Sequence, residues 1–470
     1  MNTRNHYEVA IIGAGLSGLA AGIRAAHFGR SVCIFERHNA AGGLNGFYSL
    51  DNRKFDVGLH AVTNYVPPGV RGTPLTKLLR QLRIERDELG LREQIGSAVA
   101  FGANGGARLR FDNRIELLES EVARVFPAEV DGFRRLAQCV RATPFDPDGP
   151  AISTREIFSR HLREPLLREM LLCPLMFYGS AHERDFPFSQ GAMMFQALYL
   201  EGFARPAEGV RRLMRVLLEK YRAAGGERRM KCGVRSIRTE GTRAVALILD
   251  DGTEVTADRI LSSIGGPETM ALFSAPPSSV PDPGLVTYVE TMSVLDREPR
   301  DLGWGETIVF FNEGTEFHYE QPRDAVDTRS GVICVPNNFQ FSAEERPPEG
   351  LLRITCLADY DAWANASETD YAAMKRAWFS RVQASARRFL APVADADLAA
   401  ATRATDMFTP RTIQKFTGHR NGAIYGSPDK RLRGDIGLSN LHLCGTDQGL
   451  LGIVGSMLSG IMMANLHLFN

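Results

Sequence analysis

Three glycines near the amino terminus have the spacing that binds a dinucleotide. Gly13, Gly15 and Gly18 lie in the run Gly-Ala-Gly-Leu-Ser-Gly that follows an apolar stretch, and Glu36 lies downstream. The first glycine of such a motif permits a tight turn, the second lets the backbone approach a pyrophosphate, and the third lets helix and strand pack closely. The carboxylate of Glu36 can accept hydrogen bonds from both ribose hydroxyls, and it disfavours a 2′-phosphate. A plain tight turn is the alternative interpretation of the glycines alone.

The flanking elements favour the dinucleotide site over the plain turn. Residues 8–12 predict a buried strand, residues 19–28 a helix of small residues, and residues 31–35 a second apolar strand. In such a unit the helix N-terminus faces the phosphates, where free N–H groups and the helix dipole stabilise negative charge. The predicted cofactor contacts here are Gly13, Ala14, Gly15, Leu16, Ser17, Gly18, Glu36 and Arg37.

A second glycine pair and a histidine follow this unit. The run Gly42-Gly43-Leu44-Asn45 and the run from Phe55 to His60 resemble the FAD-binding start of the flavoprotein family that contains amine oxidases, phytoene desaturases and carotenoid isomerases. The resemblance implies that the paired glycines run beside the flavin diphosphate and ribitol, and that the segment ending at His60 passes near the isoalloxazine ring. Many family members have arginine where this chain has Leu44. The contacts implied here are Gly42, Gly43, Leu44, Asn45, Gly58, Leu59 and His60.

The middle of the chain resembles the same family in the order of its elements. An amphipathic helix over 209–224 precedes a strand near Val234, a hairpin with its turn at Asp251-Gly252, and a buried strand over 257–263. The resemblance implies that backbone groups of Val234 bond the adenine and that the residues after the buried strand, Ser263 and Gly265, approach the cofactor. A sheet layer without ligand contact is the alternative interpretation.

The carboxyl-terminal segment resembles one branch of that family. Thr409-Pro410, the patch from Gly422 to Gly426 and the glycine-rich run over 441–460 are similar to the phytoene desaturase, carotenoid isomerase and retinol saturase branch. A terminal packing helix is the alternative interpretation of the last run.

The residues of that last run predict further contacts with the cofactor. A strand over 441–444 delivers a glycine, an acidic residue can bond a ribitol hydroxyl or a water near the phosphate, and a helix begins near Gly452. The first N–H groups of this helix would point at the flavin and stabilise the negative charge of the reduced ring. The residues concerned are Gly445, Asp447, Gly452, Ile453 and Val454.

The region between these motifs is expected to hold the substrate. Residues 91–206 are predicted to be mainly helical, and residues 166–200 are dense in Leu, Met, Phe and Tyr. A packed core explains this density. The wall of a long apolar pocket also explains it, because flexible Met and flat aromatic side chains suit elongated apolar ligands. Further along, strands are predicted over 307–311, 316–319 and 331–336, and a helix over 371–390.

Cofactor-like segments stand at the start, middle and end of the chain, so we predict discontinuous domains. The predicted fold class is α/β, with a Rossmann-type FAD-binding domain and a mixed sheet-and-helix substrate-binding domain. The FAD-binding domain comprises residues 1–95, 205–275 and 406–470, and the substrate-binding domain residues 96–204 and 276–405.

Composition excludes several other classes of protein. The chain has 470 residues, 44% of them hydrophobic and 23% charged, which are values of a folded globular protein. Its 55 basic and 55 acidic residues balance, so nucleic acid is not an expected partner. The 7 cysteines form no CxxC pair and no histidines stand at metal-ligand spacing, so we expect no metal and no disulfide framework. We expect a cytoplasmic protein without a transmembrane helix, and leave peripheral membrane contact and the oligomeric state open.

The resemblance implies an FAD-dependent oxidoreductase that acts on a hydrophobic isoprenoid or polyene. Such an enzyme desaturates, saturates or isomerises C=C bonds by hydride transfer with flavin N5. His60 is the candidate catalytic group beside the ring, and a structural histidine is the alternative.

Two other functions stay open. One is an amine oxidase or a hydroxysqualene-type triterpenoid dehydroxylase, and the other is a non-catalytic prenyl-binding protein. Residues 286–353 contain no lysine, which argues against an amine substrate because amine-oxidase relatives place a flavin-side lysine in that region. The intact glycine motif and Glu36 argue against the prenyl-binding protein.

Overall fold

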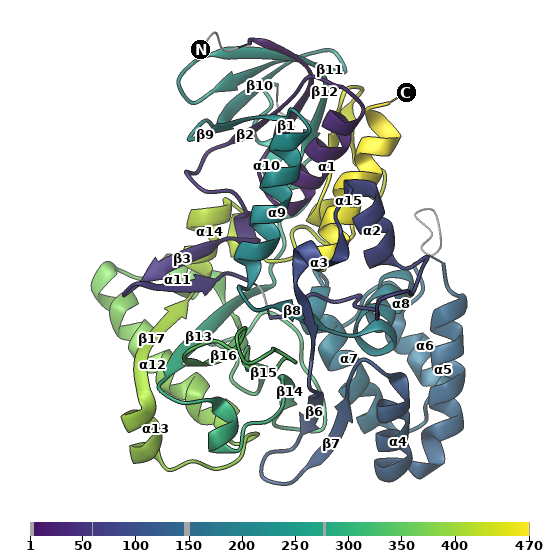
Figure 1. Cartoon of the computed structure of the whole chain (residues 1–470), viewed down its shortest axis with the longest axis vertical. Coiled ribbons are helices and arrows are strands. Elements are labelled where there is room, and N and C mark those ends of the chain that lie inside the picture. The colour runs from purple at the N-terminus through teal and green to yellow at the C-terminus, as the bar shows by residue number, and fades with distance from the viewer. Residues whose placement is uncertain (1–3, 59, 145–150, 276–278, 470) are drawn as a thin grey trace.

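The computed structural model describes residues 4–58, 60–144, 151–275 and 279–469. Two large sheets organise them, and Figure 1 shows one sheet in the upper part of the molecule and the other in the lower part. The chain starts in the upper sheet, and its last helix lies beside that sheet again.

The upper sheet has a parallel centre. Its strand order is β10-β11-β12-β1-β2-β9, and β19 pairs with β12. β1 lies between β12 and β2 and is parallel to both. Every residue of β2 is buried, as expected of a strand covered on both faces. The strands are β1 (His6–Ile12), β2 (Val32–Glu36), β9 (Glu227–Met230), β10 (Val234–Glu240), β11 (Arg243–Leu249), β12 (Glu254–Ser262), β18 (Asp435–Leu438) and β19 (Leu441–Leu443).

The first and last helices of the chain pack against each other beside the upper sheet. The helix after β1, α1, contacts both α15 and α9. A Cβ on Gly460 of α15 would lie 2.0 Å from the backbone oxygen of Ser17 in α1, so only glycine allows this close approach. The helices of this part are α1 (Leu16–His27), α2 (Pro74–Leu82), α3 (Arg86–Leu89), α9 (Val210–Ala223), α10 (Gly266–Met270) and α15 (Gly452–His467).

The lower sheet is mixed and has the order β17-β13-β16-β15-β14-β6-β7. Successive side chains of β14 point to opposite faces, as in any strand. Ile308 and Phe310 join a core with the helices of residues 115–201, whereas Val309 and Phe311 join a second core with α12. The strands are β6 (Ser97–Phe101), β7 (Ala107–Phe111), β13 (Thr287–Leu295), β14 (Ile308–Asn312), β15 (Ser330–Cys334), β16 (Gly350–Ala358) and β17 (Thr402–Phe408).

Helices cover both faces of the lower sheet. One face carries α11 (Tyr360–Ala364), α12 (Glu368–Arg387) and α13 (Asp395–Ala401). The other carries α4 (Ile115–Val125), α5 (Val130–Ala142), α6 (Thr154–His161), α7 (Pro165–Gly179), α8 (Phe188–Phe195) and a π-helix over Gln196–Glu201.

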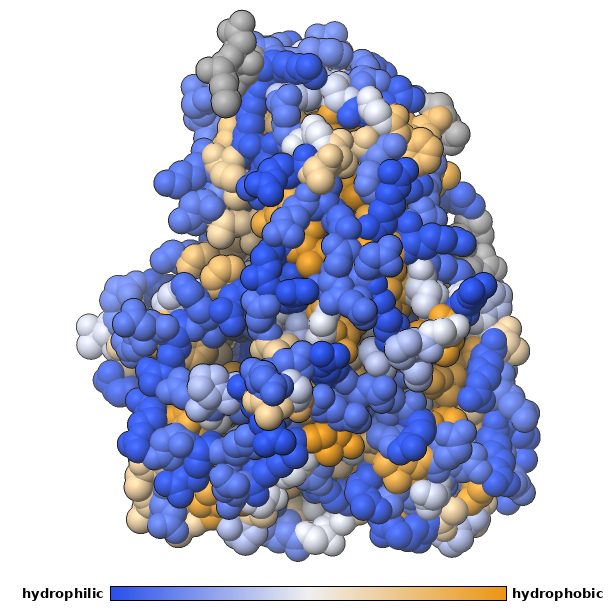
Figure 2. Space-filling model, viewed as in Figure 1, coloured by the Kyte–Doolittle hydropathy of each residue, from blue (hydrophilic) through white to orange (hydrophobic). Residues whose placement is uncertain are grey.

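Short elements connect the two parts. The hairpin of β3 (Phe47–Leu50) and β4 (Arg53–Asp56), the pair β5 (Leu91–Glu93) and β8 (Ala204–Pro206), and α14 (Pro410–Thr417) lie between the two sheets in Figure 1. The face seen in Figure 2 is mostly hydrophilic, with several separate apolar areas. Among the described residues, no helix is both long and apolar enough to cross a bilayer.

Two predictions about elements were wrong. Residues 97–101 and 107–111 were expected to be helical but form β6 and β7 at one edge of the lower sheet. The alternating burial of β7 fits a strand, because a strand at a sheet edge needs only one apolar face. Residues 316–319 form no strand.

The sheets divide the chain in a discontinuous order. Strands of the upper sheet come from residues 6–36, 227–262 and 435–443, and strands of the lower sheet from residues 97–111, 287–358 and 402–408. The exact domain boundaries given above stay a prediction.

Candidate functional site

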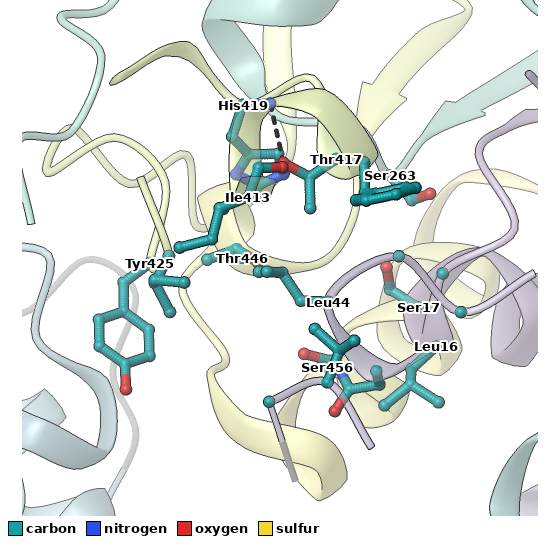
Figure 3. A pocket seen from close by; sticks show the side chains of 18 of the residues that line it. Leu16, Ser17, Leu44, Ser263, Ile413, Thr417, His419, Tyr425, Thr446 and Ser456 are labelled. Atoms are coloured by element: carbon teal, nitrogen blue, oxygen red, sulfur yellow. Dashed lines mark hydrogen bonds between the residues drawn. The ribbon is translucent and has the colours of Figure 1, made fainter. Parts of the chain in front are cut away.

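One cavity of about 610 Å³ is lined by residues of both parts of the molecule, and we call it the central cavity. Figure 3 shows how segments far apart in sequence surround it: Leu16 and Ser17 come from α1, Ser263 follows β12, and Thr417 and Tyr425 come from the carboxyl-terminal third. Most of the predicted cofactor residues line it, namely Gly13, Gly15, Leu16, Ser17, Glu36, Arg37, Gly42, Gly43, Leu44, Asn45, Gly58, His60, Val234, Ser263, Gly452 and Ile453. Their contacts with a cofactor stay predictions.

The three glycines after β1 have three different environments. Gly13 has a φ of +94°, and a Cβ there would lie 2.6 Å from the hydroxyl of Ser263. A Cβ on Gly15 would meet no atom within 4 Å, so this backbone opens directly into free space. A Cβ on Gly18 would lie 2.2 Å from the backbone oxygen of Gly13. The turn therefore leaves room for a ligand at Gly15 and holds helix against strand at Gly18.

The carboxylate of Glu36 is held by the backbone. Its Oε2 accepts a hydrogen bond from the N–H of Ala14 at 2.8 Å, and its Oε1 accepts one from the N–H of His38 at 2.9 Å. The side chain is buried but lines the cavity. Each carboxylate oxygen has a further lone pair, so Glu36 can still accept hydrogen bonds from a ligand.

Residues of α14 and the turn after it line the cavity beside Arg37. The guanidinium of Arg37 packs against Gly418, where a Cβ would lie 2.6 Å from it. Thr409-Pro410 belongs to the family resemblance, but no contact was predicted for the segment that follows it. The lining residues missed there are Ile413, Phe416, Thr417, Gly418, His419 and Arg420.

The second glycine pair forms a single helical turn beside the first. Gly42 and Gly43 have φ angles of +128° and +55°, which glycine adopts more easily than other residues. The N–H of Gly42 donates to the backbone oxygen of Ala14 at 3.0 Å, which ties this turn to the first glycine motif. Leu44 lines the cavity at the place where an arginine was expected from the resemblance.

Several predicted residues lie outside the cavity lining. Asp447, expected near the ribitol, is buried and accepts hydrogen bonds from the N–H groups of Gly266 at 2.6 Å and Ser427 at 2.8 Å. It therefore joins two loops. The described residues of the prediction that do not line the cavity are Ala14, Gly18, Gly265, Gly445, Asp447 and Val454.

Packing explains two of these positions. Val454 is fully buried in the core beside α1, so its side chain faces away from the cavity. A Cβ on Gly445 would lie 2.7 Å from the hydroxyl of Ser17, so this glycine allows a close approach between loop and helix. Leu59 lies outside the described residues.

His60 belongs to a network of buried charged groups that the sequence analysis missed. Its Nε2 lies 2.7 Å from Oε1 of Glu290 and 3.2 Å from the hydroxyl of Thr355. Arg353 donates two hydrogen bonds to Glu290, at 2.9 Å from Nε and 2.6 Å from Nη2. Burial alone would raise the pKa of Glu290, but the charge of Arg353 and the bond from His60 outweigh it and lower that pKa to about 2. Glu290 is therefore a carboxylate at neutral pH.

A second buried ion pair holds the backbone beside His60. Arg205 is paired with Asp56 and also donates to the backbone oxygen of His60 at 3.1 Å. Arg353 donates to the backbone oxygen of Asp56 at 3.1 Å. One signal in the sequence could have revealed this network, because Glu290 and Arg353 each interrupt an otherwise apolar or neutral strand.

Aromatic and aliphatic side chains line the rest of the cavity. From the apolar stretch over 166–200 only a few residues reach the lining, and the others pack in the core of the lower part. Each of the two interpretations of that stretch is thus correct for some of its residues. The apolar wall consists of Phe177, Tyr178, Leu198, Phe203, Tyr288, Ile308, Phe310, Val332, Tyr425 and Leu451.

A cluster of metal-ligand side chains lies outside the central cavity. Ligand atoms of Asp435, His442 and His467 all lie within 4.8 Å of one another. The two imidazole rings stack face to face, with centroids 3.5 Å apart and planes at 7°. Two imidazoles ligate one ion through lone pairs that lie in the ring planes and converge on it. Stacked rings do not present that geometry, so we assign no metal to this cluster.

Comparison with known proteins matches this chain to flavoproteins. The family model described as flavin containing amine oxidoreductase matches residues 16–302. The chloroplastic prolycopene isomerase of Arabidopsis thaliana is 20% identical over 92% of this chain and 76% of that protein. The all-trans-retinol 13,14-reductase of Danio rerio is 21% identical over 98% of this chain and 87% of that protein.

The fold itself is known from solved structures. An oxidoreductase from Methanosarcina mazei matches with a TM-score of 0.69 at 15% identity, over 97% of this chain and 99% of that one. At this identity the likeness shows the fold alone, and it confirms the predicted α/β class with a Rossmann-type domain.

Proposed function

Because the chain belongs to the family of flavin-containing amine oxidoreductases, and so is an FAD-dependent oxidoreductase, we propose that its substrate is an elongated hydrophobic isoprenoid or polyene. The proposed reaction is the desaturation, saturation or isomerisation of C=C bonds. The names of the two relatives described above, a prolycopene isomerase and a retinol reductase, both denote enzymes of polyenes and support this substrate class.

The residues of the central cavity fit FAD. The open space at Gly15 and the first turn of α1, which no side chain caps, suit a pyrophosphate. Glu36 has free lone pairs for ribose hydroxyls, and Gly452 and Ile453, at the start of α15, line the same cavity. We propose that these residues hold the cofactor. When bound, the flavin supplies the two-electron chemistry as a hydride acceptor or donor.

The observation that carries the proposed substrate is the continuity of the cavity. A single space is bordered by Gly15 and Glu36 in one part and by Phe177 and Phe310 in the other. Clefts lined mainly by aromatic and aliphatic side chains, with a few polar groups, bind apolar ligands. No lysine is among the described residues that line the cavity, so the lysine of amine-oxidase relatives has no counterpart here.

The proposal is tested by product analysis with the FAD-loaded protein under anaerobic conditions. Candidate polyenes of increasing length are added to the oxidised and to the reduced enzyme, flavin absorbance is followed, and products are separated by chromatography. We expect a changed polyene with at least one redox state of the flavin. Oxidation of an amine with release of hydrogen peroxide, and no change in any polyene, would replace this proposal with the amine oxidase alternative.

A contact with lipid would bring such a substrate to the enzyme, and we include peripheral membrane binding in the proposal on that ground alone. Flotation with anionic and neutral liposomes tests it. Protein that stays at the bottom of the gradient with both lipids removes this part and leaves the proposed reaction standing.

A further inference from the structure

The two ring nitrogens of His60 have different partners. Nε2 lies 2.7 Å from the Glu290 carboxylate, which can only accept a hydrogen bond. Nε2 of the neutral ring therefore carries the hydrogen, and Nδ1 carries the lone pair. Among the described residues, no hydrogen bond to Nδ1 is present. His60 lines the central cavity with about a quarter of its side chain exposed, 24%.

We infer that His60 is the proton-holding group of the reaction and that Glu290 is the positioning residue that fixes its tautomer. This rests on the proposed function. In a desaturation, Nδ1 takes a proton from a substrate carbon. The broken C–H bond leaves its electron pair to the new C=C bond, while the hydride from the neighbouring carbon goes to the oxidised flavin. In a saturation, the N–H at Nδ1 gives its proton to a carbon of the C=C bond, and the reduced flavin is the hydride source.

The surroundings of Glu290 explain why it can fix the tautomer. Arg353 is almost fully buried and donates two hydrogen bonds to Glu290, so the carboxylate cannot rotate without losing both. The hydroxyl of Thr355 lies 3.4 Å from Oε1 of Glu290 on the same side as the imidazole. The N–H at Nε2 can donate to this carboxylate whether or not Nδ1 holds a proton, so the contact is kept in both states of the ring.

A purely structural role does not account for the placement of His60. The backbone of the segment is already held by Arg205, which donates to the oxygen of His60, and by Arg353, which donates to the oxygen of Asp56. The imidazole is thus not needed to fix the loop. We expect His60→Gln to fold as the wild-type chain does.

The first test measures the tautomer of His60 directly. Holoprotein labelled with ¹⁵N-histidine is examined by NMR, and His60→Gln assigns the signal of residue 60. We expect a hydrogen on Nε2 and none on Nδ1 in the neutral ring. Glu290→Gln should shift the signal toward a mixture of tautomers, because an amide can donate as well as accept. Glu349→Gln is the matched control, since Glu349 pairs with Arg53 and does not line the cavity.

The second test measures the turnover of the polyene substrate. We expect kcat to fall by about 10² or more in His60→Gln and by about tenfold in Glu290→Gln, with KM changed much less, because a proton-transfer group acts in the transition state. Glu290→Asp should recover part of the loss. If Glu290→Gln does not fold, the double variant Glu290→Gln with Arg353→Gln is used in its place. This double variant leaves no unpaired charge at the two positions.

The outcomes separate this inference from the proposed function. A hydrogen on Nδ1 in the neutral wild-type ring, or a kcat of His60→Gln equal to that of the wild type, would overturn the inference while polyene turnover continues. Absence of turnover of every polyene by the wild-type enzyme would overturn the proposed function, and the NMR result would still decide the tautomer.

Discussion

Two regions beside the central cavity differ in composition: one consists of glycines, which have no side chain, and the other contains buried charged groups. We call the first the glycine side, formed by Gly13, Gly15, Gly18, Gly42 and Gly43. We call the second the charged side, formed by Asp56, His60, Arg205, Glu290 and Arg353. On the glycine side the absence of a Cβ sets how close the backbone comes to a ligand or a neighbour. On the charged side two ion pairs set the position of a single imidazole.

Substitutions on the two sides are therefore expected to have different effects. A side chain added to the glycine side fills space or forces the backbone apart, whereas a side chain removed from the charged side leaves a buried charge without its partner. The first change acts on ligand binding or on local packing, and the second acts on the free energy of unfolding of the whole lower part.

The largest effect on cofactor binding is expected at Gly15. A valine there would fold, because a Cβ meets no atom within 4 Å, but it would fill the space proposed for the phosphates. We expect affinity for FAD to fall by about 10²-fold or more, since an ordered phosphate site loses its backbone contacts. Flavin absorbance of the purified protein and titration of the apoprotein with FAD measure it. Gly305→Val, at a glycine with open space outside the cavity lining, is the control. Full flavin content in Gly15→Val would show that the phosphates lie elsewhere.

The largest effect on stability is expected from the removal of a carboxylate from the charged side. Glu290→Ala leaves Arg353 buried without its main partner, and we expect the free energy of unfolding to fall by about 3 to 5 kcal/mol. Urea unfolding of the FAD-free protein measures the loss. Glu349→Ala breaks the more exposed pair with Arg53 and should change stability little. Equal effects of the two changes would mean that the buried network does not stabilise the lower part.

The two sides also differ in how much of them the sequence alone could predict. The glycine side could be predicted, because a tight turn between a strand and a closely packed helix constrains residues within one short run, such as Gly13 to Gly18. The charged side could not, because Glu290 and Arg353 meet His60 only after strands of the lower sheet pair. A charged residue inside a buried strand was a visible signal, but the sequence does not say which strand neighbours it.

The wrong predictions of secondary structure have the same cause, namely strand pairing between residues far apart in the sequence. Residues 97–111 become strands because β6 pairs with β14, which is about two hundred residues away in the chain, and no local pattern encodes that neighbour. Asp447 lies in the expected motif but bonds to Gly266 and Ser427, because the loop that carries it is buried. Local motifs thus predicted which segments meet at the cavity better than which side chains point into it.

A smaller effect is expected at Gly18, which tests the packing role of the glycine side. Gly18→Ala places a Cβ about 2.2 Å from the backbone oxygen of Gly13, so helix and strand must move apart. We expect a loss of about 1 to 3 kcal/mol in the free energy of unfolding, as for other overpacked sites. Gly15→Ala, at a glycine between the two residues of that contact, adds a methyl group into open space and is the control. Denaturant unfolding of both apoproteins separates packing from cofactor binding, and equal stability would count against the close contact at Gly18.

The last predicted effect depends on pH and concerns a buried charge whose partner is more distant. Lys430 lies 3.7 Å from Asp447, and burial lowers its pKa from the usual 10.5 to about 8 despite that carboxylate. Between pH 8 and pH 10.5 the unfolded chain therefore holds a proton on this lysine that the folded chain has lost, so stability rises with pH in this window. The rise is at most about 1.4 kcal/mol per pH unit. Lys430→Met should remove it, as measured by urea unfolding at several pH values. Equal slopes for the two proteins would mean that Lys430 keeps its proton in the fold, as Glu290 keeps its charge beside Arg353.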